Sequence, residues 1–406
     1  MKQGWEIKKL GEVCDLKPQK KEAREKLSED AVVTFLPMED LGVLNKDINP
    51  TKQRVLREVV NGYTYFADNE VLLAKITPCF ENGKLGIARG LINGIGFGSS
   101  EYIVFRSKGE IIPEYLFYFL SRCDFRDEGS KLMTGAVGHK RVTKEWVENY
   151  NIPIPPIPEQ ERIVSILDKA FSAIDQAKQN AEKNLKNVKE LIDSYLQGVF
   201  ESGNWETRTL KELTTKIGSG ATPRGGQETY KSEGTSFVRS MNVHDWEFKE
   251  RNLAFIDEKQ AKELDGVTLH EDDVLLNITG ASVTRCCVFP RKYLPARVNQ
   301  HVSIIRPKNE LLDSKFLNLL LTSKPYKDKL LFTGEQGATR QAITKAQIES
   351  FRVSIPLLKE QKTIVRQFEL LRAKAQKLEA NYQQKIIELE EIKRLILQKS
   401  FNGKLL

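Results

Sequence analysis

The chain has 406 residues, more than one hydrophobic core usually holds, so two or more folding units are expected. Its mean hydropathy is −0.42 and no apolar run approaches the ~18 residues of a membrane span, and its start does not resemble a secretory signal. Five cysteines without a C-x-x-C pair indicate reduced thiols rather than a disulfide framework or a zinc site. The 63 Lys and Arg against 55 Asp and Glu permit a polyanionic partner without establishing one.

The first part of the chain is predicted to be a mainly β unit. GWEIKKLGEVCDL is a predicted strand and turn, and a Lys- and Glu-rich loop from Lys17 to Asp30 precedes the strand-like AVVTFLPMEDL. Short apolar runs broken by Gly, Asn and Pro continue from Tyr63 to Arg106. IIPEYLFYFLSR is a predicted helix with Pro113 in its first turn, where a missing N–H costs nothing. A Gly-containing loop, TGAVGHKRVT, and the short helix KEWVENY then lead to IPIPPIPEQ, which is predicted to be a hinge.

A long helix follows this hinge. Its apolar residues recur at steps of three and four from Ile163 to Val199, with one stutter after Ala181. This spacing predicts a coiled-coil seam. The alternative is an amphipathic surface helix, but ~40 residues far exceeds the usual length of such helices, which is roughly 8–20 residues.

The second part of the chain repeats the first. Glu360-Gln361 aligns with Glu159-Gln160, an offset of 201 residues (360 minus 159), and a second long helix has the same steps and stutter from Ile364 to Leu389. EDDVLLNITG matches DNEVLLAKIT, and LDSKFLNLLLTS matches IPEYLFYFLSR. The loops differ, above all where IGSGATPRGG stands in the second copy. Shared core positions with diverged loops indicate two binding modules of one design and unequal specificity.

These patterns predict an α+β fold in which two mixed α/β modules with mainly β cores are joined by two long helices. Because the second helix leaves the second module and ends the chain, a helix pair must be antiparallel, giving a pseudo-two-fold arrangement. Each helix would be a stiff rod of roughly 60 Å. The predicted parts are residues 1–155, the spacer helix 156–202, residues 203–357 and the spacer helix 358–406.

The sequence lacks the catalytic motifs that an enzyme of this size would be expected to show. Asn151-Ile152-Pro153-Ile154 lacks the stacking aromatic of an amino-methyltransferase motif, and the E-x-K at Glu391 lies inside the second long helix. IGSGATPRGG lacks the G-K-[ST] ending of a phosphate-binding loop, and the four histidines show no ligand spacing. We therefore expect no catalytic residues, no metal and no cofactor in this chain.

Two modules held apart by a stiff rod are suited to reading two separated patches on one elongated ligand, and duplex DNA is the commonest such ligand. Its binding residues are expected in the loops between the repeated strands, where Arg, Lys, Asn, Gln and His can reach base edges and Thr can hold phosphates. The candidates in the first module are Lys75, Thr77, Asn82, Lys84, His139, Lys140 and Arg141. Those in the second module are Arg224, Arg239, Asn277, Thr279, Arg285, Thr339, Arg340 and Gln341.

Taken together, the repeated motifs resemble the specificity subunits of type I restriction-modification systems over the whole chain. The resemblance is carried by W-E-x-x-x-L at Trp5 and Trp205, by V-L-L ahead of I-T at Val71 and Val274, by QHVSIIRP from Gln300, and by IPPIPEQ and IPLLKEQ before the long helices. The first copy has SSEYIVFR in place of QHVSIIRP, which places it in another subgroup and implies a different half-site.

The resemblance implies a cytoplasmic, prokaryotic protein with two target-recognition domains that each read half of a bipartite double-stranded DNA site. It implies that the helices set the unread gap and dock two methyltransferase subunits, with restriction subunits joining for cleavage. S-adenosylmethionine, ATP and Mg²⁺ would belong to those partners. The alternatives are a coiled-coil scaffold that joins proteins without reading DNA, and an enzyme acting on its own.

Overall fold

The computed structural model describes residues 4–48, 50–136, 138–335 and 342–404. The chain divides into two compact units, here called the first unit (residues 1–181 and 384–406) and the second unit (residues 182–383). Each unit contains one module of strands and short helices together with segments of both long helices, α7 (Ile157–Ser202) and α13 (Leu358–Phe401). The predicted α+β fold with two repeated modules and two long helices is therefore confirmed. Over the described residues, no helix combines the length and the apolar character that a bilayer crossing needs.

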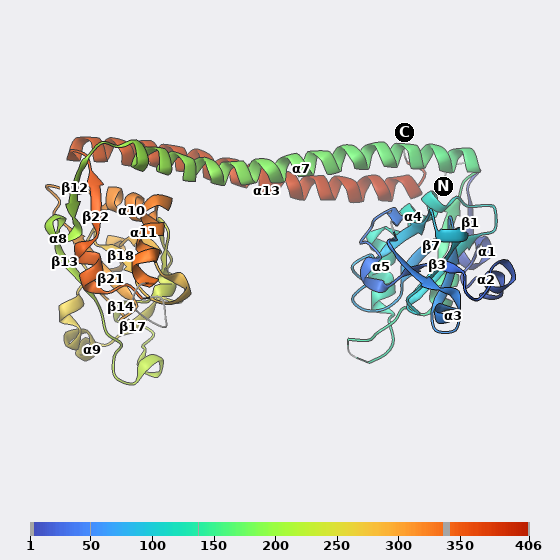
Figure 1. Cartoon of the computed structure of the whole chain (residues 1–406), viewed down its shortest axis with the longest axis horizontal. Coiled ribbons are helices and arrows are strands. Elements are labelled where there is room, and N and C mark those ends of the chain that lie inside the picture. Colours follow the sequence, from blue (N-terminus) through green and yellow to red (C-terminus); the bar gives the residue numbers. More distant parts are fainter. Residues whose placement is uncertain (1–3, 49, 137, 336–341, 405–406) are drawn as a thin grey trace. The chain divides into compact units, whose positions relative to one another are not determined.

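The module of the first unit is built on two sheets, with strand orders β2-β10-β7-β8-β4 and β5-β3-β9-β6, and the ribbon β1-β11. Figure 1 labels β1, β3 and β7 of this module. Its strands are β1 (Glu6–Lys9), β2 (Cys14–Asp15), β3 (Val32–Leu36), β4 (Asp47–Ile48), β5 (Lys52–Val55), β6 (Thr64–Ala67), β7 (Val71–Ala74), β8 (Leu85–Ala88), β9 (Ile95–Gly98), β10 (Tyr102–Ser107) and β11 (Asn151–Ile154). Its helices are α1 (Leu10–Val13), α2 (Lys21–Lys26), α3 (Leu56–Val59), α4 (Pro113–Leu120), α5 (Cys123–Lys131) and α6 (Lys144–Glu148), with 3₁₀ turns η1 (Met38–Asp40) and η2 (Ile92–Gly94).

The module of the second unit has sheets of order β13-β21-β18-β19 and β17-β14-β20 and the ribbons β12-β22 and β15-β16. Its strands are β12 (Glu206–Thr209), β13 (Thr214–Ser219), β14 (Thr235–Val238), β15 (Val243–His244), β16 (Glu247–Phe248), β17 (Ala254–Ile256), β18 (Val274–Asn277), β19 (Cys286–Val288), β20 (Ala296–Val298), β21 (Val302–Pro307) and β22 (Arg352–Ile355). Its helices are α8 (Leu210–Leu213), α9 (Glu258–Glu263), α10 (Ser314–Thr322), α11 (Lys324–Glu335) and α12 (Lys345–Ser350), and its 3₁₀ turns are η3 (Gly226–Thr229), η4 (Ser240–Asn242), η5 (Asp265–Val267), η6 (Gly280–Ser282) and η7 (Arg291–Tyr293).

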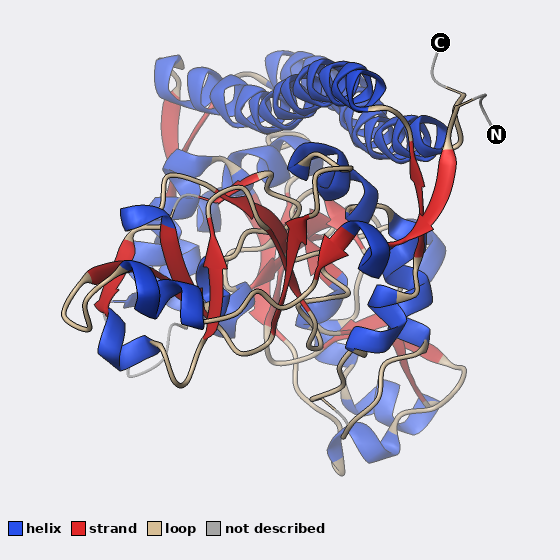
Figure 2. Ribbon diagram, turned by 90° about the vertical axis from the view of Figure 1, so that its right-hand side faces the viewer, coloured by secondary structure: helices blue, strands red, loops and turns tan. Residues whose placement is uncertain are grey.

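Two local predictions were wrong. The predicted hinge contains β11, whose Pro153 lies opposite Ile7 of β1 in a two-stranded ribbon. Proline is tolerated there because an edge strand can do without one N–H donor. The predicted loop from Lys17 to Asp30 contains α2, whose single buried residue, Ala23, belongs to a core cluster beneath the β5-β3-β9-β6 sheet. Figure 2 shows such short helices beside the strands.

The long helices run antiparallel, as predicted. In the first unit, Lys178 of α7 pairs with Glu390 of α13 at 2.5 Å, and Asp175 pairs with Lys393 at 2.8 Å, so the residue numbers rise on one helix while they fall on the other. In the second unit, the Tyr195 hydroxyl donates to Gln367 at 3.3 Å. The predicted seam of α7 is buried or half-buried throughout, and Leu196, which the spacing did not indicate, is buried beside it. On α13 the seam prediction fails at Leu378, which is 42% exposed.

Aromatic side chains tie the ends of the long helices into the module cores. In the first unit, the ring of Phe401 at the end of α13 lies 5.0 Å from that of Tyr115 and 5.3 Å from that of Phe119, both on α4. In the second unit, Phe200 of α7 lies 5.6 Å from Phe316 of α10 and 6.0 Å from Tyr326 of α11. Aromatic pairs in these arrangements are worth about 0.5–1.5 kcal/mol beyond their area burial.

A buried glutamine fixes the start of each long helix. The Oε1 atom of Gln160 accepts a hydrogen bond from the backbone N–H of Ile112 at 2.9 Å, and its Nε2 atom donates to the carbonyl oxygens of Glu110 and Pro155, both at 2.8 Å. The side chain of Gln160 is fully buried. All three partners are backbone groups of the loop before α4 and of the segment after β11.

The second unit repeats this arrangement 201 residues later (361 minus 160). The Gln361 Oε1 atom accepts from the backbone N–H of Asp313 at 2.9 Å, and Nε2 donates to the carbonyls of Leu311 and Pro356 at 2.9 Å each. Gln361 is also fully buried. The E-Q pair that recurs in the sequence is thus explained by its glutamine, which joins each module to its helix.

Replacing Gln160 with alanine is expected to destabilise the first unit. The change leaves one N–H and two carbonyls of the backbone buried without a partner, and each such group costs about 1–3 kcal/mol. We expect a loss of roughly 3 kcal/mol or more, measured as earlier urea unfolding and faster amide exchange in α4 and β11. Gln176→Ala, on the exposed face of the same helix, is the matched control and should change stability by less than ~0.5 kcal/mol. Equal effects of the two changes would contradict the anchoring role.

Candidate nucleic-acid interface

Three loops of the first unit meet where β7 ends. The backbone N–H of Lys75 donates to the carbonyl of Glu101 in the turn between β9 and β10, at 2.9 Å. The backbone N–H of Val142 donates to the carbonyl of Lys75, and the backbone N–H of Thr77 donates to the carbonyl of Lys140, each at 2.9 Å. These bonds bring the predicted residues Lys75, Thr77, Lys140 and Arg141 into one loop cluster, although the first two lie more than sixty residues before the last two (140 minus 77 is 63).

An ion pair orders the side chains of this cluster. Arg141 donates through Nε and Nη2 to both carboxylate oxygens of Glu101, at 2.9 and 2.7 Å, and through Nη1 to the carbonyl of His139 at 2.9 Å. The hydrogen bonds from Arg141 hold the pKa of Glu101 below its usual range. Lys75 donates to the carbonyl of Ser100 at 3.0 Å. The guanidinium of Arg141 is therefore held in one orientation, while the side chain as a whole stays 43% exposed.

The other predicted residues of the first unit differ in availability. His139 and Lys140 are exposed in the same loop, and Asn82 is exposed in the neighbouring turn. The hydroxyl of Thr77 donates to Glu81 at 2.7 Å. Lys84 donates to the carbonyl of Met38 at 2.6 Å, which directs its ammonium group toward η1 and away from the loop cluster.

A surface cavity of about 960 Å³, here called the basic hollow, is lined in part by Lys75 and Arg141. Its lining adds lysines from the segment that leads into α2 and from the first residues of α2 and α6, one tyrosine just before β6 and one within it: Lys17, Lys20, Lys21, Lys144, Tyr63 and Tyr65. Burial, together with the nearby charges of Lys17 and Arg24, lowers the pKa of Lys20. Clustered cations are the feature that binds phosphates. Of the two tyrosines, Tyr63 is 37% exposed and can offer a ring face to a base, whereas Tyr65 is buried.

The sequence prediction missed the lysines of the basic hollow. The Lys-rich segment from Lys17 can be recognised in the sequence, but it lies about fifty residues before the loop cluster. Its position beside Arg141 is set by the folded sheet and cannot be predicted from local sequence. Glu101 was also missed, because its importance comes from the pairing with Arg141.

In the second unit a different set of side chains occupies the same backbone frame. The N–H of Ile278, the residue after β18, donates to the carbonyl of His301 at 3.0 Å, as Lys75 does to Glu101. Thr279 Oγ1 lies 2.6 Å from His301 Nδ1, and Gln300 Nε2 lies 3.2 Å from His301 Nε2. Thr222 also hydrogen-bonds Gln300. His301 and Gln300 belong to the QHV motif, which could have marked them as site residues.

A strained turn supports this second loop cluster. Asn277 is fully buried and donates to the carbonyl of Ser240 at 2.9 Å and to the hydroxyl of Ser282 at 3.1 Å. Thr284 has φ of 70°, a conformation that costs a β-branched residue of order 1–3 kcal/mol. Its buried hydroxyl and the Oδ1 atom of Asn277 find no hydrogen-bond partner among the described residues. The side chain of Asn277 thus holds the turn in place rather than facing solvent.

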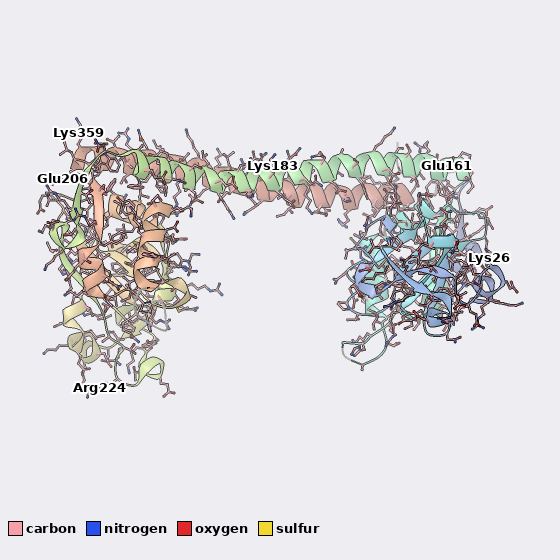
Figure 3. The ribbon with its side chains drawn as sticks, viewed as in Figure 1. Lys26, Glu161, Lys183, Glu206, Arg224 and Lys359 are labelled. Carbon is pink, nitrogen blue, oxygen red and sulfur yellow. The ribbon has the colours of Figure 1, made fainter. Side chains whose placement is uncertain are left out.

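The remaining predicted residues of the second unit are spread over several loops. Figure 3 shows Arg224 at the end of this unit opposite Glu206 and Lys359, and Arg224 is exposed. Arg239 donates to the carbonyl of Asn252 at 2.5 Å and lies over the ring of Tyr230 at 5.3 Å. Arg285 is half-buried in the turn before β19. The predicted residues Thr339, Arg340 and Gln341 lie outside the described residues.

A second basic depression, of about 540 Å³, lies along β13 and α12. Lys211, Lys216 and Lys345 line it, and burial, followed by the charge of Arg306, lowers the pKa of Lys216. Strand β13 and helix α12 correspond to β2 and α6, which border the basic hollow. Each unit therefore combines an ordered loop cluster with a lysine-lined depression. Within the described parts of the chain, no group of three or more His, Cys, Asp or Glu side chains could hold a metal ion.

Comparison with solved structures supports the fold. A chain from a structure concerning complex assembly and conformational transition of the type I R-M system matches with a TM-score of 0.79 and 21% identity, over 100% of this chain and 99% of that chain. The HsdS subunit from Thermoanaerobacter tengcongensis matches with a TM-score of 0.68 and 20% identity, over 100% and 98% of the two chains.

Comparison of sequences gives relatives of one kind. The EcoEI specificity subunit of Escherichia coli is 34% identical over 205 residues, which are 50% of this chain and 34% of that subunit. This match therefore spans about a third of that relative's length. A putative MjaX specificity subunit of Methanocaldococcus jannaschii is 23% identical over 354 residues, covering 83% of this chain and 78% of the relative.

A family model matches both halves of the chain, over residues 2–186 and 202–390. Its boundaries place one copy of the domain on each module together with part of the long helix that follows. The chain therefore belongs to the family of the type I restriction modification DNA specificity domain.

Proposed function

We propose that this chain is the DNA-specificity subunit of a type I restriction-modification complex. Each module reads one half of an asymmetric bipartite site in double-stranded DNA, and α7 and α13 set the length of the unread gap. The observation that carries the proposal is that one backbone frame presents different side chains in the two units, Glu101 with Arg141 in the first and His301 with Thr279 in the second. Different donors and acceptors at equivalent places suit the reading of two different base sequences.

The partners follow from this role. Two methyltransferase subunits dock on the long helices and methylate an adenine in each half-site after flipping it out of the stack. Restriction subunits join for cleavage. S-adenosylmethionine, ATP and Mg²⁺ act in those partners, and this chain contributes recognition without catalysis. The complex works in the prokaryotic cytoplasm, where chromosomal DNA lies.

The lysines of the basic hollow are expected to supply sequence-independent affinity. We expect the triple change of Lys17, Lys20 and Lys144 to alanine to weaken binding of the reconstituted methyltransferase complex to all duplexes alike. The slope of log K against log salt should fall by ~0.9 for each lost phosphate contact. Fluorescence anisotropy at several salt concentrations measures both quantities. Lys26→Ala, which changes an exposed lysine at the end of α2 outside the lining, is the matched control. Binding that does not depend on salt or sequence would favour a protein scaffold instead.

The two loop clusters are expected to control separate half-sites. Arg141→Ala should relax base preference in one half-site by about 1–3 kcal/mol, because a positioned guanidinium is lost. His301→Ala should relax the other half-site and leave the first unchanged. Sequencing of methylated adenines on a randomised duplex library reads both effects. If both variants relaxed the same half-site, the assignment of one module to each half would be refuted.

The paired helices are expected to act as a spacer. Insertion of one heptad at Asn184 together with one at Lys385 keeps the antiparallel seam in phase and lengthens both helices equally. The methylated site should gain unread base pairs between unchanged half-sites. A heptad in one helix alone is the control and should abolish activity, since it breaks the pairing. Altered half-sites with an unchanged gap would contradict the spacer role.

A further inference from the structure

A pocket of about 430 Å³ lies in the first unit between the module and its segments of the long helices. Its apolar and aromatic walls come from the loop before β4, from α4 and from both long helices: Leu44, Phe117, Tyr118, Phe171 and Leu397. The buried Ser121 also lines it. Its volume falls in the range of roughly 300–1,000 Å³ that small-molecule sites occupy. It is distinct from the basic hollow and shares no lining residue with it.

The internal repeat shows what fills this position in the second unit. Leu44 lies four residues after η1, and Trp246 lies four residues after η4. Both have left-handed backbones, with φ of 47° and 65°. Both donate a backbone N–H to the chain where it enters the second strand of the β7-β8 or β18-β19 hairpin: Leu44 to the carbonyl of Gly83, two residues before β8, at 2.8 Å, and Trp246 to the carbonyl of Cys286, the first residue of β19, at 3.0 Å. Leu44 is therefore the counterpart of Trp246.

In the second unit the indole of Trp246 packs between the module and α13. Its ring lies 5.5 Å from that of Phe368, and the guanidinium of Arg372 lies 5.6 Å from its centroid. The indole N–H donates to the hydroxyl of Thr322 on α10 at 2.6 Å. The ring is thus held by one hydrogen bond and by side chains of the long helix.

The pocket of the first unit keeps the same two features. Ser121 is the counterpart of Thr322 at the repeat offset of 201 residues, and its hydroxyl donates to the carbonyl of Tyr118 at 2.8 Å, which leaves its oxygen able to accept. Phe171 is the counterpart of Arg372 and supplies an aromatic wall, with the ring of Tyr118 5.5 Å away. The ring-binding surroundings are present, while leucine replaces the ring itself.

The charged groups around the pocket are largely paired with one another. Lys46 binds Asp168 at 2.5 Å, and Lys393 binds Asp175 at 2.8 Å. Arg126 donates to the carbonyl of Ser121 at 2.5 Å. Because these charges are already satisfied, the pocket favours a neutral ligand over an ionised one.

We propose that this pocket binds a neutral, planar aromatic ring of indole size whose N–H donates to Ser121. Two sources share this chemistry: a free indole-type compound and a tryptophan side chain of a partner polypeptide. Phe171 of α7 and Tyr118 of α4, whose rings are perpendicular to each other, pack against the bound ring from two sides. A ring bound here touches α4, α7 and α13 together, and so joins the module of the first unit to its helix segments.

The test is calorimetric titration of the full-length chain with indole and with N-acetyl-tryptophanamide. Indole should bind at one site per chain. Leu44→Trp places the missing ring in the pocket and should weaken binding at least tenfold. Leu132→Trp, which adds the same ring at another exposed leucine, should leave binding unchanged. Trp246→Leu should open the equivalent site in the second unit and raise the stoichiometry from one to two.

Ser121→Ala gives an independent reading of the hydrogen bond. This change should weaken the binding of indole about fivefold. It should leave the binding of 1-benzothiophene unchanged, because that compound has the same shape but no N–H. Binding of N-acetyl-tryptophanamide with the same dependence on Leu44 supports a polypeptide source, whereas binding of indole alone supports a free compound. The proposal is overturned if the wild-type protein does not bind indole up to the solubility limit of indole, or if Leu44→Trp binds indole as the wild type does.

Discussion

The hydrogen bonds of two buried glutamines hold the modules to the long helices, and the rest of the structure depends on them. A glutamine side chain offers one carbonyl acceptor and two N–H donors, and both Gln160 and Gln361 use all of these functions on backbone groups. No module side chain takes part in these bonds. The sequence of a module can therefore change without weakening its attachment, provided that the loop before α4 or α10 keeps its path.

The attachment is reinforced from the opposite end of each helix. α7 begins at the first module and ends with Phe200 in the core of the second, and α13 begins at the second module and ends with Phe401 in the core of the first. Each unit thus contains the anchored start of one helix and the aromatic end of the other. A loss of packing at either place exposes the apolar seam of both helices, so folding of a module and pairing of its helix segments are coupled.

The same division between fixed backbone and variable side chains runs through the loop clusters. Glu101 and His301 occupy equivalent places because their carbonyls accept from Lys75 and Ile278, and this bond is indifferent to the side chains. One position then carries a carboxylate that orients an arginine, and the other an imidazole that bonds a threonine. A change of specificity at such a position requires no change of the frame.

How far the sequence predicts this molecule depends on the range of the interactions involved. The long helices and the repeat were predictable because the spacing of apolar residues is a local property of the sequence. Whether one of these residues is buried depends on tertiary packing, and Leu378, which fits the spacing, is 42% exposed. The strand β11 was missed because Pro153 and the prolines that follow the strand suggest a hinge, and its partner β1 begins 145 residues earlier (151 minus 6). The candidate site was predicted only to the level of loops. Asn277 and Thr279 are two residues apart and both polar, yet the side chain of Asn277 is buried and donates to the carbonyl of Ser240, whereas that of Thr279 hydrogen-bonds His301. Those partners come from other loops, so which residue is presented is decided by the fold and not by the local sequence.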